Sequence, residues 1–175
     1  MEVYEAIKIR KSVRSYDAKP IPDDILMRIL EAGRAAPSAN NGQPWHFIVV
    51  KSREKREVLS KRMFARFLLE SPIVIVGCGD SGGRFHVVDV SIAMQQMVLA
   101  ATSEGLGTCG IGDFDEKVIR ELLRVPEKYG VVCLLALGYP REKLELVAKL
   151  LGKRSRKRIE SIVSYEEFGN SLASR

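Results

Sequence analysis

Two short segments near the N-terminus hold the residue types that could do chemistry. The first is Arg10-Lys-Ser-Val-Arg14, which the aromatic Tyr16 follows. If this segment is extended, its period of two points Arg10, Ser12 and Arg14 to one side. Guanidinium groups match phosphate oxygens in pairs, so the cluster suits a phosphate or a polyol. The alternative is a solvated basic loop without a ligand.

The second segment is Pro37-Ser-Ala-Asn-Asn-Gly-Gln-Pro-Trp45, a turn rich in small polar residues. It precedes the apolar run 47–50, so by itself it is typical of an ordinary connection between a helix and a strand. Short motifs taken singly often match by chance. Both segments together, in this order, favour a functional interpretation.

The order of these segments resembles the nitroreductase family of flavin enzymes. Members of that family begin with a helix that ends in Arg-x-Ser-x-Arg/Lys and an aromatic residue. A second helix then leads into Pro-Ser-x-x-Asn-x-Gln-Pro-Trp and a strand. The likeness continues at Gly105–Asp115 and Leu134–Pro140, and it ends with the basic run Lys153–Arg158. It covers nearly the whole chain, and the first two motifs are the specific ones.

The resemblance implies an α+β fold with a central mixed β-sheet flanked by helices, in an intertwined homodimer. It also implies FMN as cofactor and NADH or NADPH as electron donor. An electron-poor small molecule such as a nitroaromatic or a quinone would be the acceptor, in a ping-pong scheme. No catalytic side chain is expected, because the flavin carries the chemistry. Residues 1–175 are expected to form a single FMN-binding domain, with 141–175 as an extended C-terminal arm.

The same resemblance implies roles for individual residues. Arg10 and Ser12 would hold the phosphate and ribityl chain, and Arg14 would lie nearer the ring and tune it. Ser38 and Asn41 would reach the flavin from the other subunit. The complete set of expected cofactor-binding residues is Arg10, Lys11, Ser12, Arg14, Pro37, Ser38, Asn41, Gln43, Gly110, Gly112, Asp113, Arg154 and Arg156.

Some of these assignments stay open. Gln43 is expected to brace its loop more than to bind the cofactor directly. Arg154 and Arg156 match a second phosphate clamp, but the neighbouring cations 157–158 leave its register undecided. Gly110 lies where many relatives carry a bulky residue, which implies a wider pocket and looser acceptor specificity. The backbone N–H groups of Gly112 and Asp113 would meet the ring.

The glycine-rich run Gly105–Gly110 satisfies the pattern G-x-G-x-x-G, the fingerprint of dinucleotide-binding proteins. That fingerprint must follow a strand and open a helix. Here a helix of about twenty residues runs directly into the first glycine. We therefore interpret Gly105 as a helix C-cap and reject a Rossmann fold.

Composition excludes several other classes of protein. The chain has 175 residues, 46% of them hydrophobic, which predicts one domain with a substantial core. Three scattered cysteines and two histidines disfavour a disulfide framework and a metal site, and indicate a cytoplasmic protein. No run of 18 apolar residues occurs, so membrane spanning and secretion are not expected.

The net charge of +6 raises the question of nucleic acid. The excess is concentrated in Lys8–Arg14 and Lys153–Arg158, which suits one polyanionic ligand or a basic face for RNA. No aromatic residues interleave with either cluster, which disfavours nucleic acid as a partner. Flavin-binding relatives with another task, such as dehalogenation, flavin fragmentation or a non-catalytic role, remain the alternative.

Hydrophobic periodicity predicts the elements that position these segments. The helix over 85–104 is apolar on most sides, which indicates burial in a large core or a shared subunit interface. The other expected helices are 3–8, 23 to near 37, 54–69, one capped by Asp115, and 142–151. The expected strands are 47–50, 73–76, 108–112 and 131–137.

Overall fold

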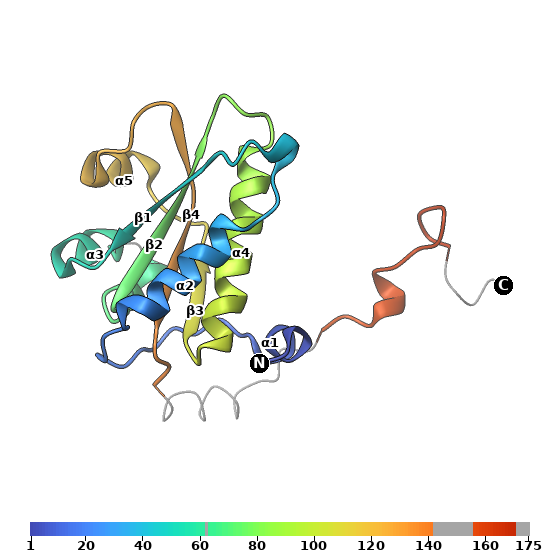
Figure 1. Ribbon diagram of the computed structural model, residues 1–175, viewed down its shortest axis with the longest axis horizontal. Helices are drawn as coiled ribbons and strands as arrows, with labels where there is room; N and C mark the ends of the chain where they lie inside the picture. The colour runs from blue at the N-terminus through green and yellow to red at the C-terminus, as the bar shows by residue number, and fades with distance from the viewer. Residues whose placement is uncertain (62, 142–155, 171–175) are drawn as a thin grey trace. The chain divides into compact units, whose positions relative to one another are not determined.

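The computed structural model describes residues 1–61, 63–141 and 156–170, and it divides the chain into two units, 1–141 and 142–175. The first unit is built on a four-stranded sheet in the order β1-β2-β4-β3 (Figure 1). The strands are β1 (Trp45–Val50), β2 (Ile73–Asp80), β3 (Gly107–Ile111) and β4 (Tyr129–Gly138). Every neighbouring pair is antiparallel, and a parallel pairing occurs at the isolated bridge between Ser12 and Thr108. The α+β class is confirmed.

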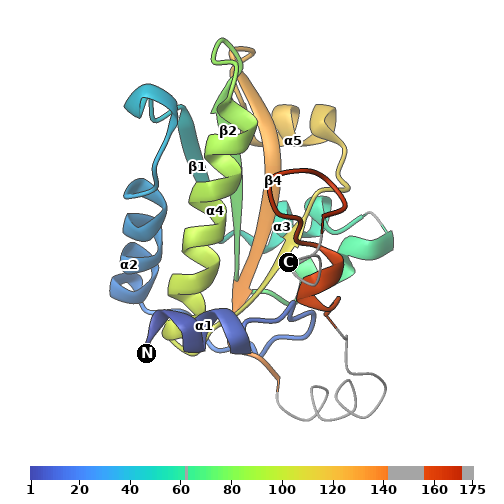
Figure 2. The ribbon, with the colours of Figure 1, turned by 90° about the vertical axis from the view of Figure 1, so that its right-hand side faces the viewer.

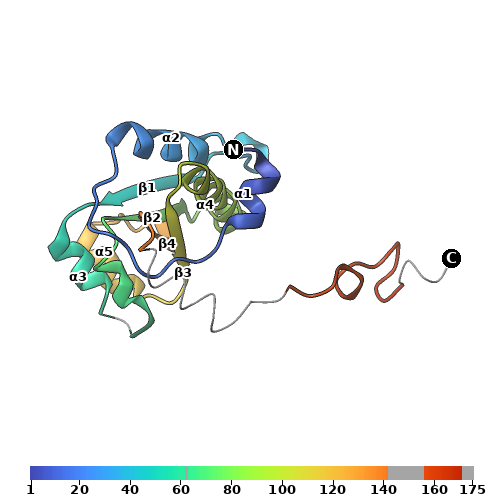
Figure 3. The same cartoon turned by 90° about the horizontal axis from the view of Figure 1, so that it is seen from below.

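Helices cover both faces of this sheet, as Figure 3 shows. The helices α2 (Asp23–Arg34) and α4 (His86–Ser103) pack with Ile73 and Ile75 of β2. The helices α3 (Arg53–Leu59) and α5 (Glu116–Leu123) pack with Val74 and Val76. Alternate residues of β2 thus face opposite layers, because successive side chains of a strand point to opposite faces.

Local signals place several element ends where the sequence predicted them. The helix α2 begins directly after Pro22, and the side chain of Asp115 caps α5 by accepting from the N–H of Val118. Gly105 follows the end of α4 with a φ of 75°, which is the left-handed conformation expected of a C-cap glycine.

The helix expected over residues 54–69 is wrong. The helix α3 ends at Leu59, and a separate 3₁₀ helix spans Met63–Leu68. A continuous helix would place Leu68 about 13 Å along the axis from Leu59, whereas both side chains belong to one buried cluster. Buried Arg56 holds the turned chain, because its Nη1 donates to the carbonyls of Leu69 (2.8 Å) and Ser71 (2.5 Å).

The helices α4 and α1 (Val3–Ile9) each leave a group of apolar side chains exposed. The helix α4 buries Val90 and Met94 against the sheet, but Val87 and Val88 on its other side are about half exposed. The helix α1 buries Ala6 and exposes most of its other apolar residues, namely Val3, Tyr4, Ile7 and Ile9. None of the helices in the described part of the chain is long and apolar enough to cross a membrane.

The second unit is described over residues 156–170. It contains a short 3₁₀ helix, Ile159–Ser161, and an exposed apolar side chain at Phe168. The helix expected over 142–151 lies outside the described residues.

Candidate functional site

The basic segment Arg10–Arg14 runs beside strand β3. Ser12 bridges to Thr108, and the N–H of Val13 donates to the carbonyl of Thr108 at 2.8 Å. Val13 is buried, while Ser12 and Arg14 on either side of it are exposed. The segment is therefore extended here, and the side chains of Ser12 and Arg14 are accessible to a ligand, as their spacing predicted.

The turn after this segment is fixed by Tyr16. Its ring is fully buried, and its hydroxyl donates to the carbonyl of Val13 at 2.6 Å. Burial raises the pKa of Tyr16 well above its usual value, so the phenol remains protonated and keeps donating. Tyr16 therefore acts as a structural anchor for Arg14.

The two arginines of the segment carry uncompensated charge. Within residues 1–61, 63–141 and 156–170, no carboxylate forms an ion pair with Arg10 or Arg14. The guanidinium of Arg14 instead lies 6.0 Å from the ring centre of Phe67. Some other arginines are neutralised, as Arg28 is by Glu104. Unpaired, accessible guanidinium groups next to a hydroxyl are suited to an anion.

The end of β3 and the residues that follow it, 110–113, are glycine-rich and continue the same edge of the sheet. Gly110 and Gly112 are exposed, and a β-carbon built on either would meet no atom within 4 Å. Strand β3 pairs with β4 on one side only, apart from the bridge at Thr108. The backbone at Gly110 and Gly112 is therefore open to a flat ligand lying beside the basic segment.

The second motif forms a tight loop between α2 and β1. Asn40, Asn41 and Gln43 have φ values of 51°, 55° and 46°. The hydroxyl of Ser38 accepts from the N–H of Gln43 at 2.9 Å, and the Gln43 side chain donates to the carbonyl of Asn41 at 3.2 Å. Gln43 thus braces the loop, as the sequence predicted, while Pro37 and Asn41 are exposed.

One chain does not bring the two motifs together. The loop 37–44 precedes β1 at one edge of the sheet, whereas the basic segment flanks β3 at the opposite edge. They also lie at opposite ends of the strands (Figure 1, Figure 2). With a rise of about 3.3 Å per residue and about 4.8 Å between strands, they are separated by roughly 25–30 Å.

Two of the expected cofactor-binding residues, Arg154 and Arg156, belong to the C-terminal part of the chain. Arg154 lies outside the described residues. Arg156 is exposed in the separately described segment 156–170.

Two further expected residues are also exposed: Lys11 lies beside Ser12, and Asp113 follows the end of β3. The structure thus groups Arg10, Lys11, Ser12 and Arg14 with Gly110, Gly112 and Asp113.

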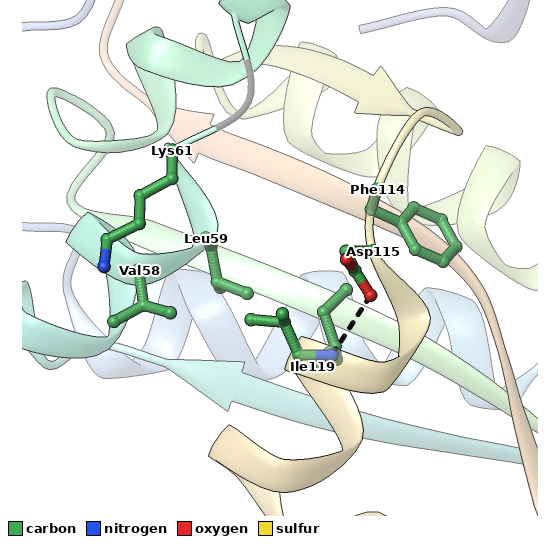
Figure 4. A pocket seen from close by; sticks show the side chains of 7 residues that line it. Val58, Leu59, Lys61, Phe114, Asp115 and Ile119 are labelled. Carbon is green, nitrogen blue, oxygen red and sulfur yellow. Dashed lines mark hydrogen bonds between the residues drawn. The ribbon is translucent and has the colours of Figure 1, made fainter.

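Figure 4 shows a hollow of 330 Å³ between α3 and α5. Its walls are mostly apolar, with Leu59 facing Ile119 across it. The carboxylate of Asp115 is engaged in capping α5, at 3.3 Å from the Val118 nitrogen. Lys61 is the single cation among the described residues that line it. A phosphate-bearing ligand is better matched by the basic segment.

A second hollow, of 530 Å³, lies between the loop 39–44 and the turn 80–86. Its lining is more polar and includes Asp80, His86 and Asp89. Asp89 is buried, and its Oδ1 accepts a hydrogen bond from the N–H of Ala39 at 3.2 Å. This hollow therefore adjoins the inner side of the loop that carries Ser38 and Asn41.

The thiols of Cys78 and Cys133 are not suited to act as nucleophiles. Cys78 is buried and Cys133 is partly buried, and neither forms a disulfide. Burial raises the pKa of each thiol to about 11. Both therefore stay protonated near neutral pH, and a thiolate mechanism is not supported.

Sequence reasoning missed Phe67, Thr108 and Asp89 as parts of this region. Phe67 and Thr108 carry no local signal, because their roles depend on which segment packs beside them. Asp89 could have been found, since it is the one carboxylate in helix α4, whose residues are mostly apolar.

Comparison with known proteins adds an independent line of evidence. The model of the family described as "Putative TM nitroreductase" matches residues 2–172. A protein of Methanothermobacter thermautotrophicus named "Putative NADH dehydrogenase/NAD(P)H nitroreductase" is 38% identical over 151 residues, which cover 81% of this chain and 79% of that protein.

Solved structures and other relatives agree with this match. An FMN-dependent nitroreductase from Clostridium difficile R20291 has a TM-score of 0.81 and 32% identity, over 93% of this chain and 98% of that one. An FMN reductase of Bacillus subtilis is 28% identical, over 81% of this chain and 67% of that protein.

More distant relatives are named for other reactions. A 5,6-dimethylbenzimidazole synthase of Rhodospirillum rubrum is 26% identical, over 77% of this chain and 80% of that protein. An iodotyrosine deiodinase of Thermotoga neapolitana is 24% identical, over 95% and 98% of the two chains.

Proposed function

This chain belongs to the nitroreductase family, and on that premise we propose that it is an FMN-dependent oxidoreductase. It takes a hydride from NADH or NADPH and passes it to an electron-poor small molecule, such as a nitroaromatic or a quinone. The observation that carries this proposal is the pair of unpaired arginines, Arg10 and Arg14, beside an exposed glycine-rich turn. The free thiols of Cys78 and Cys133 favour a reducing compartment, so we propose a cytoplasmic location.

The residues present fit FMN. A phosphate dianion needs hydrogen-bond donors and positive charge without competing carboxylates. At the start of the segment, Arg10 supplies a cationic guanidinium and Ser12 supplies a neutral hydroxyl donor. Arg14, which lies against Phe67, is placed farther along toward the turn 110–113. The open backbone at Gly110 and Gly112 leaves room for a planar ring to approach. When bound, FMN supplies the hydride transfer that no side chain here can perform.

Each group in this arrangement then has a defined task. Arg10 and Ser12 bind the phosphate and ribityl chain, with Lys11 adding positive charge. Arg14 places its charge near the ring, and the N–H groups of Gly112 and Asp113 donate to the ring edge. Arg154 and Arg156 are proposed as the second contact to the phosphate.

We also propose a homodimer in which the two motifs meet across the interface. Loop 37–44 lies roughly 25–30 Å from the basic segment of its own chain, a separation that FMN does not span. Pro37, Ser38, Asn41 and Gln43 would therefore serve the flavin bound by the partner. The half-exposed apolar side chains of α1 and α4 supply the surface that such a dimer buries.

The test begins with the purified protein. We expect a yellow preparation whose absorption bands are those of a flavin and whose cofactor is FMN after denaturation. Steady-state turnover with NADH and NADPH against nitroarenes, quinones, halogenated phenols and free flavin then identifies the donor and the acceptor class. A colourless protein that also fails to bind added FMN would refute the proposal.

A further inference from the structure

Asp89 occupies an unusual position for a carboxylate. It lies in the first turn of α4 on the side that packs toward the protein interior, and it is 6% exposed. Its Oδ1 accepts from the backbone N–H of Ala39, fifty residues earlier in the chain. A buried carboxylate is costly unless hydrogen bonds compensate for lost water, so this contact has a structural reason to persist.

The loop that Asp89 contacts is strained. Asn40, Asn41 and Gln43 all have φ near 50°, a region that residues other than glycine seldom adopt. Such conformations persist where surrounding contacts hold them, and they are frequent at functional sites. The loop therefore needs anchors outside itself.

Two hydrogen bonds from outside the loop hold its ends. The N–H of Asp80 donates to the carbonyl of Pro44 at 2.9 Å and fixes the end that enters β1. Asp89 fixes the other end through Ala39. Asn41 lies between these two anchor points and Ser38 directly precedes Ala39, so the positions of the Asn41 amide and the Ser38 hydroxyl depend on this backbone.

We propose that Asp89 is a positioning residue for the flavin site: its carboxylate fixes the strained loop that presents Ser38 and Asn41. This inference rests on the proposed function, because it takes the loop to serve the FMN bound by the partner subunit. Asp89 does not touch the cofactor and acts through the N–H of Ala39. The helix whose exposed face is proposed to form the dimer thus also sets the geometry of the loop.

The alternative role for Asp89 is to stabilise α4 by its charge alone, and this role predicts a different result. A carboxylate in the first turn of a helix stabilises that helix through the macrodipole, whatever it bonds to. Asp89→Asn removes the charge but keeps an oxygen that can accept from Ala39, whereas Asp89→Ala removes both. A positioning role therefore predicts that Asn rescues the site and Ala does not, while a charge role predicts that both fail alike.

The experiment uses the full chain and two measurements. Amide hydrogen exchange of residues 38–43 reports the loop, and quenching of FMN fluorescence reports cofactor affinity. In Asp89→Ala we expect exchange of the loop to speed up about tenfold and the FMN dissociation constant to rise about tenfold. In Asp89→Asn both values should remain within about twofold of the unmodified protein.

A matched control separates loop positioning from loss of helix stability. Ala101→Gly weakens α4 about 18 Å farther along its axis, without contact to the loop. It should lower the melting temperature yet leave loop exchange and FMN affinity unchanged. Unaltered loop exchange in Asp89→Ala, or equal impairment in Asp89→Asn and Asp89→Ala, would overturn the inference. Failure of the unmodified protein to bind FMN would refute the proposed function instead, and loop exchange would still test the contact.

Discussion

Gly107 lies so close to Val13 that a β-carbon built on Gly107 would come within 2.7 Å of Cγ2 of Val13. That distance is too short for any real contact, so the absence of a side chain at Gly107 lets the basic segment lie against β3. The pairing of Ser12 with Thr108 depends on this close approach. Strand β3 and the basic segment therefore act as one unit in placing Ser12 and Arg14.

Gly107→Ala should weaken FMN binding while the protein still folds. The added methyl group pushes Val13 outward and shifts Ser12 and Arg14 relative to the turn at 110–113. We expect the FMN dissociation constant, measured by fluorescence quenching, to rise about tenfold, because each displaced charge-assisted contact is worth about 1.5–3 kcal/mol. The control is Gly130→Ala in β4, whose added carbon would lie 3.7 Å from His86, an ordinary contact distance. Equal affinities of the two variants would contradict the prediction.

Arg10→Ala should weaken FMN binding more than Gly107→Ala does. Arg10 has no carboxylate partner in the described parts of the chain, so its removal leaves no buried charge behind and the fold should survive. Loss of one guanidinium contact to a phosphate dianion corresponds to about a tenfold to hundredfold loss of affinity. Arg53→Ala, an exposed arginine at the start of α3, makes the same change in net charge and should bind FMN normally. An unchanged FMN affinity in Arg10→Ala would remove Arg10 from the site.

Much of the fold could be predicted because its signals are local. The proline before α2, the capping carboxylate of Asp115 and the β-branched run 73–76 each determine an element end through contacts within a few residues. The break after Leu59 could not be predicted in this way. It depends on Arg56 bonding carbonyls of residues 69 and 71, which the folded chain brings together.

The candidate site likewise contains residues with a local sequence signal and residues whose role depends on tertiary contacts. Arg10, Ser12 and Arg14 could be proposed as ligand-binding residues from their spacing, since a period of two needs no knowledge of the neighbouring strand. The contribution of Gly107 required knowing that Val13 packs on it. The contribution of Asp89 required knowing that α4 meets a loop fifty residues earlier in the chain.

A charge on the exposed side of α4 should dissociate the proposed dimer and release its flavin. Ile92 is 37% exposed on this helix, and burying a glutamate there across an apolar interface is costly. Sedimentation of Ile92→Glu should give a monomer at micromolar concentration, with FMN largely lost. Val118→Glu is the matched control. Val118 has a similar exposed fraction, 39%, but it lies on α5, outside the proposed interface. A stable monomer that keeps FMN would refute the link between assembly and cofactor binding.

The thiols should react slowly with alkylating reagents in the folded protein. Burial raises the pKa of Cys78 and Cys133 from 9.0 to about 11, and only the thiolate reacts. At pH 8 this shift lowers the thiolate fraction about a hundredfold, so labelling with iodoacetamide should slow by at least that factor relative to the protein in denaturant. Raising the pH toward 10 should speed labelling of the folded protein roughly tenfold per unit. Rapid labelling of either cysteine at pH 8 would show that its thiol is not held in the protonated form.

Mixed subunits test whether each flavin site draws on two chains. Suppose that one subunit carries Arg10→Ala and Arg14→Ala, and the other carries Asn41→Ala. If the loop serves the partner's flavin, a heterodimer has one intact site and one site with all the defects. Both sites are impaired in each parental homodimer, so activity of the heterodimer should exceed both parents and approach about half of the unmodified enzyme.

The prediction follows from the separation of the two motifs in one chain, roughly 25–30 Å by strand geometry. Sites that lie within single chains would gain nothing from mixing, because each chain would keep its own defect. The two variants should be refolded together, the heterodimer confirmed by mass, and NADH-dependent quinone reduction assayed beside both parents. FMN content per dimer gives a second readout, since the heterodimer should hold one tightly bound flavin. Activity equal to the average of the parents, with flavin content to match, would show that each site belongs to one chain and that the loop 37–44 has another task.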